Sequence, residues 1–155
     1  MGSKKAEQLT DIVLAIFQLN GVLADWGDNF VSADGLTSAK WQMLGAVALS
    51  DHPLTAPQVG MAMGVTRQGA QKQLNVLVSE GLLETRPNPM HKRSSHYYLT
   101  QVGRAKYEAI EKRWNSHAQR VSSSFSSSDL AVAESLLRKM TRIYADPSVH
   151  HEAKA

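Results

Sequence analysis

Apolar residues recur at intervals of three and four along most of the chain, which is the spacing of amphipathic helices. In residues 7–30 they fall at positions 9, 12, 13, 16, 19, 23, 26 and 30. This pattern predicts one long helix, followed by a turn in the segment SADG at residues 32–35. Similar patterns predict a helix over residues 101–121 and another over residues 129–145, separated by a serine-rich break. Asp146 and Pro147 are expected to end the last helix.

Three shorter helices are expected in the centre of the chain. Thr37 is a plausible N-cap for the first, whose apolar face holds Trp41, Leu44, Val47 and Ala48. The second begins with Thr55 and Gln58 at the spacing of a capping box, and Pro57 stands in the first turn, where no donor is needed. It is expected to stop at Gly64, a residue suited to the left-handed conformation that ends helices.

The third central helix follows after a turn of about three residues. Thr66 is its expected N-cap and Gly81 lies just past its expected end, while Ala70, Leu74, Leu77 and Val78 form its buried stripe. Gly60 places a small residue where the two helices would cross. Two capped helices joined by a short turn that contains a glycine predict a helix-turn-helix motif. The alternative is an ordinary pair of packed helices, as found in any small helical protein.

A β-hairpin is expected directly after this motif. The strand-like segments LLETR and SHYYL flank a centre that holds prolines and then His91, Lys92 and Arg93. One of Tyr97 and Tyr98 should pack on the core and the other should face solvent. A hairpin in this place is a wing, so the expected fold is mainly α with a small β-hairpin wing: a winged helix-turn-helix, residues 36–121, with a helical dimerisation region formed by residues 1–35 and 122–155.

Composition narrows the possible functions. The chain has 155 residues, 43% of them hydrophobic and 20% charged, which is typical of one folded domain. Cysteine is absent, which excludes disulfides and thiolate chemistry, and no histidine spacing suggests a metal site. The polar tail with His150, His151 and Glu152 is interpreted as solvated, and no cofactor is expected. No continuous apolar run of about 20 residues exists, so no membrane span and a cytoplasmic location are expected.

Charge is unevenly distributed along the chain. The net charge is only +3, but residues 55–106 hold seven basic and two acidic residues, a net charge of +5. The remainder carries ten basic and twelve acidic residues, a net charge of −2. Positive charge concentrated on the predicted helix-turn-helix and wing favours a polyanionic partner such as double-stranded DNA.

Three segments, LTSAKWQML, VGMAMGVTRQGAQKQLNVLVSEGLL and NPMHKRSSHYYLTQVGR, occur in this order. Together they resemble the MarR family of winged helix-turn-helix transcriptional regulators, over nearly the whole chain and most strongly from Leu36 to Arg104. The resemblance implies a homodimer with interlocked end helices that binds pseudo-palindromic DNA, usually as a repressor. It also implies release by a small, often aromatic or anionic, effector. One departure concerns the wing, where the family's usual Asp position holds His91.

The expected DNA contacts lie on the second helix of the motif and on the wing. Arginine can bind guanine and glutamine can bind adenine in the major groove, while wing cations suit the minor groove or phosphates. Glycine in the first helical turn is unfavourable by about 1 kcal/mol, so Gly69 suggests a close approach of backbone to DNA. The candidates are Thr55, Thr66, Arg67, Gln68, Gly69, Gln71, Lys72, His91, Lys92 and Arg93.

The effector site is less well specified by the sequence. The candidate lining residues are Trp26, Phe30, Trp41, Met43 and Trp114, and ordinary core packing is an alternative for each of them. Two other functional classes remain as alternatives: an enzyme, for which no nucleophile–base constellation is found, and a winged-helix protein-interaction adaptor without specific DNA binding. The basic segment favours the DNA-binding regulator over both.

Overall fold

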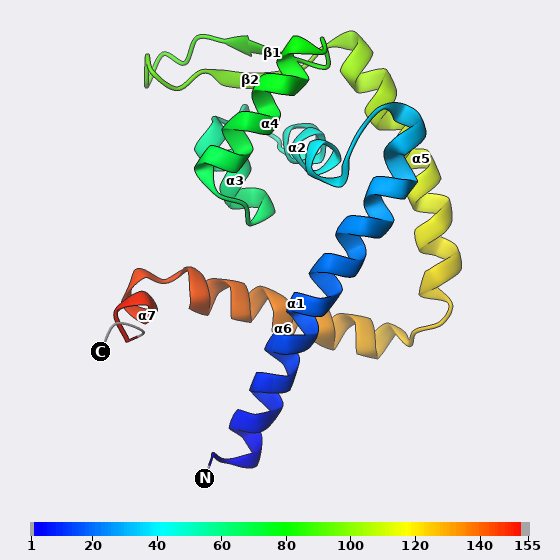
Figure 1. Ribbon diagram of the computed structural model, residues 1–155, viewed down its shortest axis with the longest axis vertical. Coiled ribbons are helices and arrows are strands. Elements are labelled where there is room, and N and C mark those ends of the chain that lie inside the picture. Colours follow the sequence, from blue (N-terminus) through cyan, green and yellow to red (C-terminus); the bar gives the residue numbers. More distant parts are fainter. Residues whose placement is uncertain (1, 153–155) are drawn as a thin grey trace. The chain divides into compact units, whose positions relative to one another are not determined.

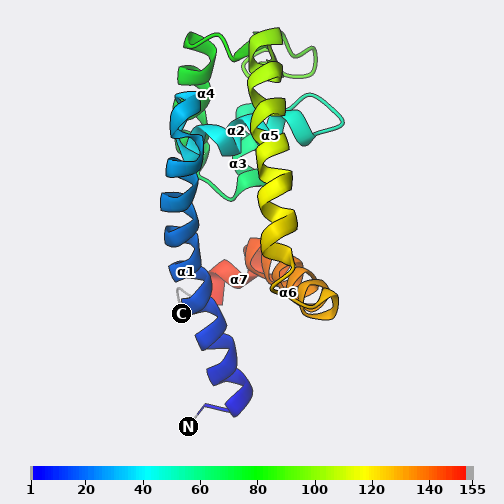
Figure 2. The same ribbon diagram turned by 90° about the vertical axis from the view of Figure 1, so that its right-hand side faces the viewer.

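The computed structural model describes residues 2–152 and is mainly helical, with one two-stranded sheet (Figures 1 and 2). The elements are α1 Lys4–Val31, η1 Ser32–Asp34, α2 Ser38–Leu49, α3 Ala56–Met63, α4 Arg67–Ser79, β1 Leu83–Arg86, β2 His96–Leu99, α5 Gln101–Ser122, α6 Ser127–Ala145 and α7 Pro147–Glu152. They divide into one compact unit up to Glu111 and a second from Lys112 onward. The order of elements confirms the predicted fold class.

The first unit is built around the helix-turn-helix. Helices α3 and α4 pack against each other, and α2 packs against both of them. Figure 1 shows α4 running from α3 to the hairpin of β1 and β2. The side chains of Leu44, Val59, Leu74 and Leu77 are fully excluded from solvent and form the centre of the core. The buried stripe that the sequence predicted on α4 is confirmed for Ala70, Leu74 and Leu77, and Val78 is half-buried against the same core.

Hydrogen bonds at the helix ends confirm the predicted caps. The Thr37 hydroxyl accepts the N–H of Lys40 at 3.2 Å, and the Thr66 hydroxyl accepts the N–H of Gly69 at 3.0 Å. At the start of α3 the backbone N–H of Thr55 donates to Oε1 of Gln58 at 2.9 Å. Because these groups satisfy N–H donors that a helix start leaves free, they set where each helix begins.

Glycines appear where the backbone must turn or where elements approach closely. Gly64 ends α3 with a φ of 66°, in the left-handed region, so that only three residues separate α3 from α4. At Gly60 a Cβ would lie 3.1 Å from the carbonyl oxygen of Val65 and 3.3 Å from Cβ of Ala70. The predicted close crossing at Gly60 is therefore confirmed, and a larger residue there would push α3 away from α4.

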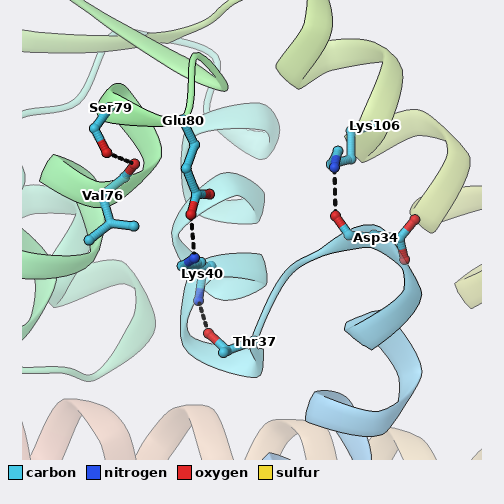
Figure 3. A network of polar contacts seen from close by, with 7 residues as sticks. All are labelled: Asp34, Thr37, Lys40, Val76, Ser79, Glu80 and Lys106. Atoms are coloured by element: carbon cyan, nitrogen blue, oxygen red, sulfur yellow. Dashed lines mark hydrogen bonds and ion pairs between the residues drawn. The ribbon is translucent and has the colours of Figure 1, made fainter.

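Polar contacts join helices of the first unit (Figure 3). The ammonium group of Lys40 on α2 lies 2.7 Å from a carboxylate oxygen of Glu80, which caps the end of α4. The ammonium group of Lys106 on α5 donates to the backbone carbonyl of Asp34 at 2.5 Å. These contacts join α2 to α4 and α5 to η1 within the first unit.

The hairpin places one tyrosine inside and one outside. Antiparallel pairing sets Thr85 opposite Tyr97 and Glu84 opposite Tyr98. Tyr97 is only 6% exposed, and its N–H donates to the carbonyl oxygen of Leu54 at 2.9 Å, so β2 is also tied to the segment before α3. The ring of Tyr98 faces outward, with the guanidinium of Arg86 4.0 Å from its centroid. The predicted alternation of the two tyrosines is confirmed.

The second unit contains the end of α5 with α6 and α7. Asp146 caps the end of α6 as expected, but the chain then forms the short helix α7, which the sequence analysis did not predict. Proline is favoured in the first turn of a helix, so Pro147 begins a new helix instead of only ending the old one. The side chains of His150, His151 and Glu152 lie outside the described residues.

Helix α1 has an apolar central segment. An 18-residue window within the stretch from Lys4 to Asp34 has a mean hydropathy of 1.3, so by length and composition alone this helix could cross a membrane, a test that helices of soluble proteins also pass. The sequence contains no uninterrupted apolar run of about 20 residues, and the expectation of no membrane span stays a prediction. Apolar and polar residues alternate on an exposed helix here, and the average over 18 residues still reaches the value of a membrane span.

Candidate nucleic-acid interface

The first turn of α4 presents polar side chains to solvent. Arg67, Gln68 and Lys72 are exposed, whereas Ala70 and Leu74 on the opposite side of the same turns are fully buried. The inward stripe fixes the rotation of the helix, because turning it would bring the buried residues into water. The three polar candidates for DNA contact therefore lie on the solvent-exposed side of α4, and the opposite side is packed into the core.

The wing tip is held by a buried asparagine. Asn88 is 7% exposed, and its side-chain Oδ1 accepts the backbone N–H of Met90 at 3.0 Å. The backbone carbonyl of Asn88 accepts the N–H of His91 at 3.2 Å. An asparagine side chain that bonds its own chain two residues on forms an Asx turn. The tip that carries His91, Lys92 and Arg93 is thus shaped by an amide, without the carboxylate that the family resemblance would supply.

Four of the predicted contact residues surround one cavity. A space of about 740 Å³ lies between the start of α3, the start of α4 and the wing, and its lining includes Thr55, Arg67, His91 and Arg93. A smaller space of about 200 Å³ has Arg67 and Arg93 in its lining together with Gln71. The structure therefore brings the first residue of α4 close to the wing, although 26 positions separate the two arginines in the sequence.

The cations of α4 and the wing tip form no ion pairs in the part of the chain that the structure describes. Among the described residues, no acidic group pairs with Arg67, Lys72, Lys92 or Arg93, and all four are exposed. By contrast, Arg86 bonds Glu84 at 2.7 Å, and Arg138 bonds Glu134 at 2.9 Å. The bond to Glu84 also raises the pKa of Arg86 above its usual value. The positive charges of α4 and the wing tip are thus not compensated by acidic groups within residues 2–152.

The two threonine candidates are not equivalent. The hydroxyl of Thr55 donates to Oε1 of Gln58 at 3.2 Å, so its hydrogen is engaged within the chain. The hydroxyl of Thr66 accepts the N–H of Gly69, and no acceptor among the described residues takes its hydrogen. A hydroxyl can accept and donate at once, so Thr66 can cap α4 and still donate to a phosphate.

Gly69 is less open than the sequence suggested. A Cβ at this position would lie 3.0 Å from the hydroxyl oxygen of Thr66, the same oxygen that caps the helix. Glycine therefore has a local reason here: it leaves room for the cap. The hypothesis of a close approach to DNA remains a prediction beside this intramolecular explanation.

Gln71 is already engaged inside the protein. Its side-chain nitrogen donates to Oδ1 of Asn75 and to the hydroxyl of Tyr97, both at 2.9 Å. Tyr97 belongs to the wing, so this amide links α4 to the hairpin. The sequence gave no sign of the contact, because Gln71 and Tyr97 lie 26 positions apart and are brought together only by the register of the hairpin.

The aromatic candidates for an effector site fall into two groups. Trp26 stacks on Phe30 with ring centroids 4.7 Å apart, and Phe30 lies 5.3 Å from Trp41. Met43 is 1% exposed and belongs to the core. Trp114 lies in the second unit, where its ring centroid is 5.6 Å from that of His117. None of these five residues lines the two cavities beside the wing.

Sequence reasoning did not identify Asn88, Tyr97 and His96 as parts of this region. A signal existed for Asn88: it stands between Pro87 and Pro89, and an asparagine between prolines is typical of a turn. His96 lines the larger cavity together with His52, from a different part of the chain. No spacing in the sequence could indicate that meeting.

A helix-turn-helix followed by a hairpin, with unpaired cations on the second helix and on the hairpin tip, defines a winged-helix DNA-binding protein. The model of the MarR family matches residues 34–94, which include the helix-turn-helix, the first strand of the wing and most of its tip. A crystal structure of a MarR family transcription regulator is 30% identical, covers 93% of this chain and 95% of its own, and superposes with a TM-score of 0.74. The chain belongs to the MarR family of transcription regulators, whose members are not enzymes.

Two further comparisons add detail. An uncharacterized protein of Mycobacterium tuberculosis is 41% identical over 108 residues, which are 70% of this chain and 74% of that protein. A mutant MarR from E. coli in complex with operator DNA is 22% identical, covers 89% of this chain and 99% of its own, and gives a TM-score of 0.72. The second comparison shows that this fold also occurs in a DNA-bound protein.

Proposed function

We propose that this protein is a sequence-specific repressor that binds a pseudo-palindromic operator as a homodimer in the cytoplasm and leaves it when a small aromatic or anionic effector binds. The observation that carries DNA binding is the set of exposed, unpaired cations on α4 and the wing. A cation without an acidic partner keeps its full charge for phosphates, and positive charge on both a helix and a wing can span adjacent grooves.

Base contacts are assigned to the start of α4. Arg67 and Gln68 are exposed in its first turn, and this end of a helix is the one that approaches base edges in the major groove. Lys72 is placed on phosphates one turn later. Lys92 and Arg93, with His91, are placed on the minor groove or its phosphates, because the wing tip projects beyond α4 (Figure 1). Thr66 supplies a hydroxyl to a phosphate.

Dimerisation is supported by apolar faces that the chain does not cover itself. On α1, Leu14, Phe17 and Val22 are more than half exposed. In the second unit, Phe125 and Val132 are also more than half exposed. Such surface is costly in water and is typical of an interface between subunits. A second copy of the chain would cover it, and a symmetric dimer matches the symmetry of a pseudo-palindrome.

Effector release is assigned to the stacked aromatic group of Trp26, Phe30 and Trp41. Aromatic side chains from α1 and α2 can accept a planar ligand by stacking. Because α2 packs against α3 and α4, a ligand there would act on the motif through a direct contact between helices. Titration of the dimer with aromatic carboxylates, followed by tryptophan fluorescence and DNA release, tests this part alone.

The test of the main proposal is selection of duplexes from a random DNA library by the full-length protein. Repeated binding and amplification should enrich one sequence with two related half-sites, which the dimer then shifts in a gel. If no sequence is enriched while the protein is folded and dimeric, the proposal of sequence-specific binding is wrong. Placing the enriched sequence over a promoter and measuring transcription in vitro then distinguishes a repressor from an activator.

A further inference from the structure

We infer that Tyr97 and Asn75 are positioning residues that occupy both side-chain N–H donors of Gln71 and leave only its carbonyl oxygen free to contact a base in the major groove. Gln71 therefore accepts a hydrogen bond from adenine or cytosine at one base position and excludes guanine and thymine there. The inference rests on the proposed DNA-binding function and assigns base preference to one position of each half-site.

Both N–H donors of the Gln71 side chain are used inside the protein. A glutamine side chain has two N–H donors and one carbonyl acceptor. Its nitrogen donates to Oδ1 of Asn75 and to the hydroxyl of Tyr97, both at 2.9 Å, so both hydrogens are used. Its oxygen takes part in no contact among the described residues. Gln71 is exposed, so this oxygen is the group that it can offer to a ligand.

Asn75 and Tyr97 hold the Gln71 amide in place. Tyr97 is buried, lies in β2 and donates its backbone N–H to Leu54, so its hydroxyl has a fixed position. Asn75 lies one turn further along the same helix as Gln71. The side-chain nitrogen of Gln71 is therefore bound both to the wing strand and to its own helix. Rotating the amide to expose an N–H would break at least one of these bonds.

The donors and acceptors on the base edges determine which bases the free oxygen of Gln71 can contact. The usual pairing of glutamine with adenine uses two bonds, in which the oxygen accepts from N6 and an N–H donates to N7. With both N–H groups engaged, only the bond to an amino group remains. Adenine N6 and cytosine N4 are donors in the major groove, whereas guanine O6 and thymine O4 are acceptors that face an acceptor unfavourably. The braced Gln71 is thus selective for an amino group and indifferent between the two bases that carry one.

Removing either partner of Gln71 should change its base preference. Tyr97→Phe removes one acceptor and frees one N–H of Gln71, which can then donate to N7 of adenine. Asn75→Ala frees the other N–H from the exposed side of the helix and leaves the buried tyrosine in place. Each variant should raise the preference for adenine over cytosine by about fivefold or more, the effect of one added bond in a bidentate contact. Tyr98→Phe is the matched control, since that hydroxyl lies on the same strand but faces outward.

The experiment uses the full-length protein and the sequence enriched from the random library. Gln71→Ala first identifies the base position that Gln71 contacts, by loss of preference there. Binding titrations then compare all four bases at this position for the wild type, Tyr97→Phe, Asn75→Ala and Tyr98→Phe, after thermal melts establish that each variant is folded. We expect adenine and cytosine to bind within about threefold of each other in the wild type and in Tyr98→Phe, and to separate in the other two variants.

Three results would overturn the inference while leaving DNA binding intact. They are a wild-type protein that already prefers adenine strongly, an adenine-to-cytosine ratio that is unchanged in both Tyr97→Phe and Asn75→Ala, and a Gln71→Ala protein with unchanged preferences at every position. If Tyr97→Phe fails to fold, Asn75→Ala alone decides. Failure to enrich any sequence would instead overturn the proposed function, and with it the premise of the inference.

Discussion

Asn88 and Met90 are joined at the base of the wing tip, where the buried side-chain oxygen of Asn88 accepts the backbone N–H of Met90 at 3.0 Å. This bond precedes His91, Lys92 and Arg93 and closes the turn from which they project. The wing tip of this chain therefore depends on an asparagine for its shape. The relation is testable because the bond can be removed without changing the charge of the wing.

Asn88→Ala should lower the free energy of unfolding by about 1 kcal/mol, the contribution of one hydrogen bond, and weaken binding to the enriched operator. The weaker binding follows from a wing tip that must be ordered on contact with DNA. Chemical denaturation and binding titrations measure the two effects. Asn88→Asp keeps the acceptor and should retain more stability than the alanine variant. Equal stability of Asn88→Ala and the wild type would show that the turn does not need this bond.

Gly69→Ala tests why a glycine occupies the first turn of α4. Helix propensity alone favours alanine by about 1 kcal/mol, but the added Cβ would lie 3.0 Å from the capping oxygen of Thr66. We expect most of the gain to be lost, with a melting temperature near that of the wild type.

Gly45→Ala is the matched control for Gly69→Ala. A Cβ there would make ordinary contacts at 3.8 Å with Tyr107 and 4.0 Å with Met63, and stability should rise. If backbone approaches DNA at Gly69, operator affinity should fall in Gly69→Ala and stay unchanged in Gly45→Ala. Unchanged affinity in both would show that the glycine serves the cap alone.

The dimer is tested by mass and by one substitution. Sedimentation at micromolar concentration should give about twice the 17.0 kDa of one chain. Phe17→Asp places a charge on the apolar face of α1, where the side chain is 70% exposed, and should yield monomer or unfolded chain together with loss of operator binding. Leu49→Asp is the control, because Leu49 is 69% exposed at the end of α2, outside the helices assigned to dimerisation. A folded wild-type monomer would contradict this part of the account.

Much of the fold could be predicted from the sequence because its signals are local. Thr37, Thr55 and Thr66 each mark a helix start through a bond that spans three residues, and Gly64 marks a helix end through its own conformation. The apolar spacing on α4 fixes which side is buried, and by exclusion which side is free. These determinants do not depend on distant parts of the chain, so periodicity and capping patterns were sufficient to predict them.

The candidate site was predictable only in part because its geometry depends on distant pairs. The link from Gln71 to Tyr97 and the shared cavity of Arg67 and Arg93 both require the wing to fold back beside α4. The assignment of Gln71 to base contact, made from its position on the helix, did not include the bonds that occupy its nitrogen. The membrane-like hydropathy of α1 was missed for a different reason, since its apolar residues are interspersed with polar ones.

Base contacts are assigned to α4 and phosphate contacts to the wing, and substitutions in the two elements should therefore have different effects. Arg67→Ala or Gln68→Ala should cost about 1–3 kcal/mol on the enriched operator and little on random duplex, because base contacts exist only on the correct sequence. Arg93→Ala should weaken binding to both duplexes nearly equally, as expected for a phosphate contact. Titrations of each variant on both duplexes provide the measurement. A uniform loss for Arg67→Ala would assign that residue to the backbone instead.

The central claim is that the unpaired cations of α4 and the wing bind DNA, and the salt dependence of operator binding tests it most directly. If each subunit neutralises about three to four phosphates, a plot of log affinity against log salt for the dimer should have a slope of about −5 to −7. Arg93→Ala should make this slope shallower by about 1 per subunit. A wild-type slope shallower than about −2, or an Arg93→Ala slope equal to that of the wild type, would contradict the assignment of these cations to DNA.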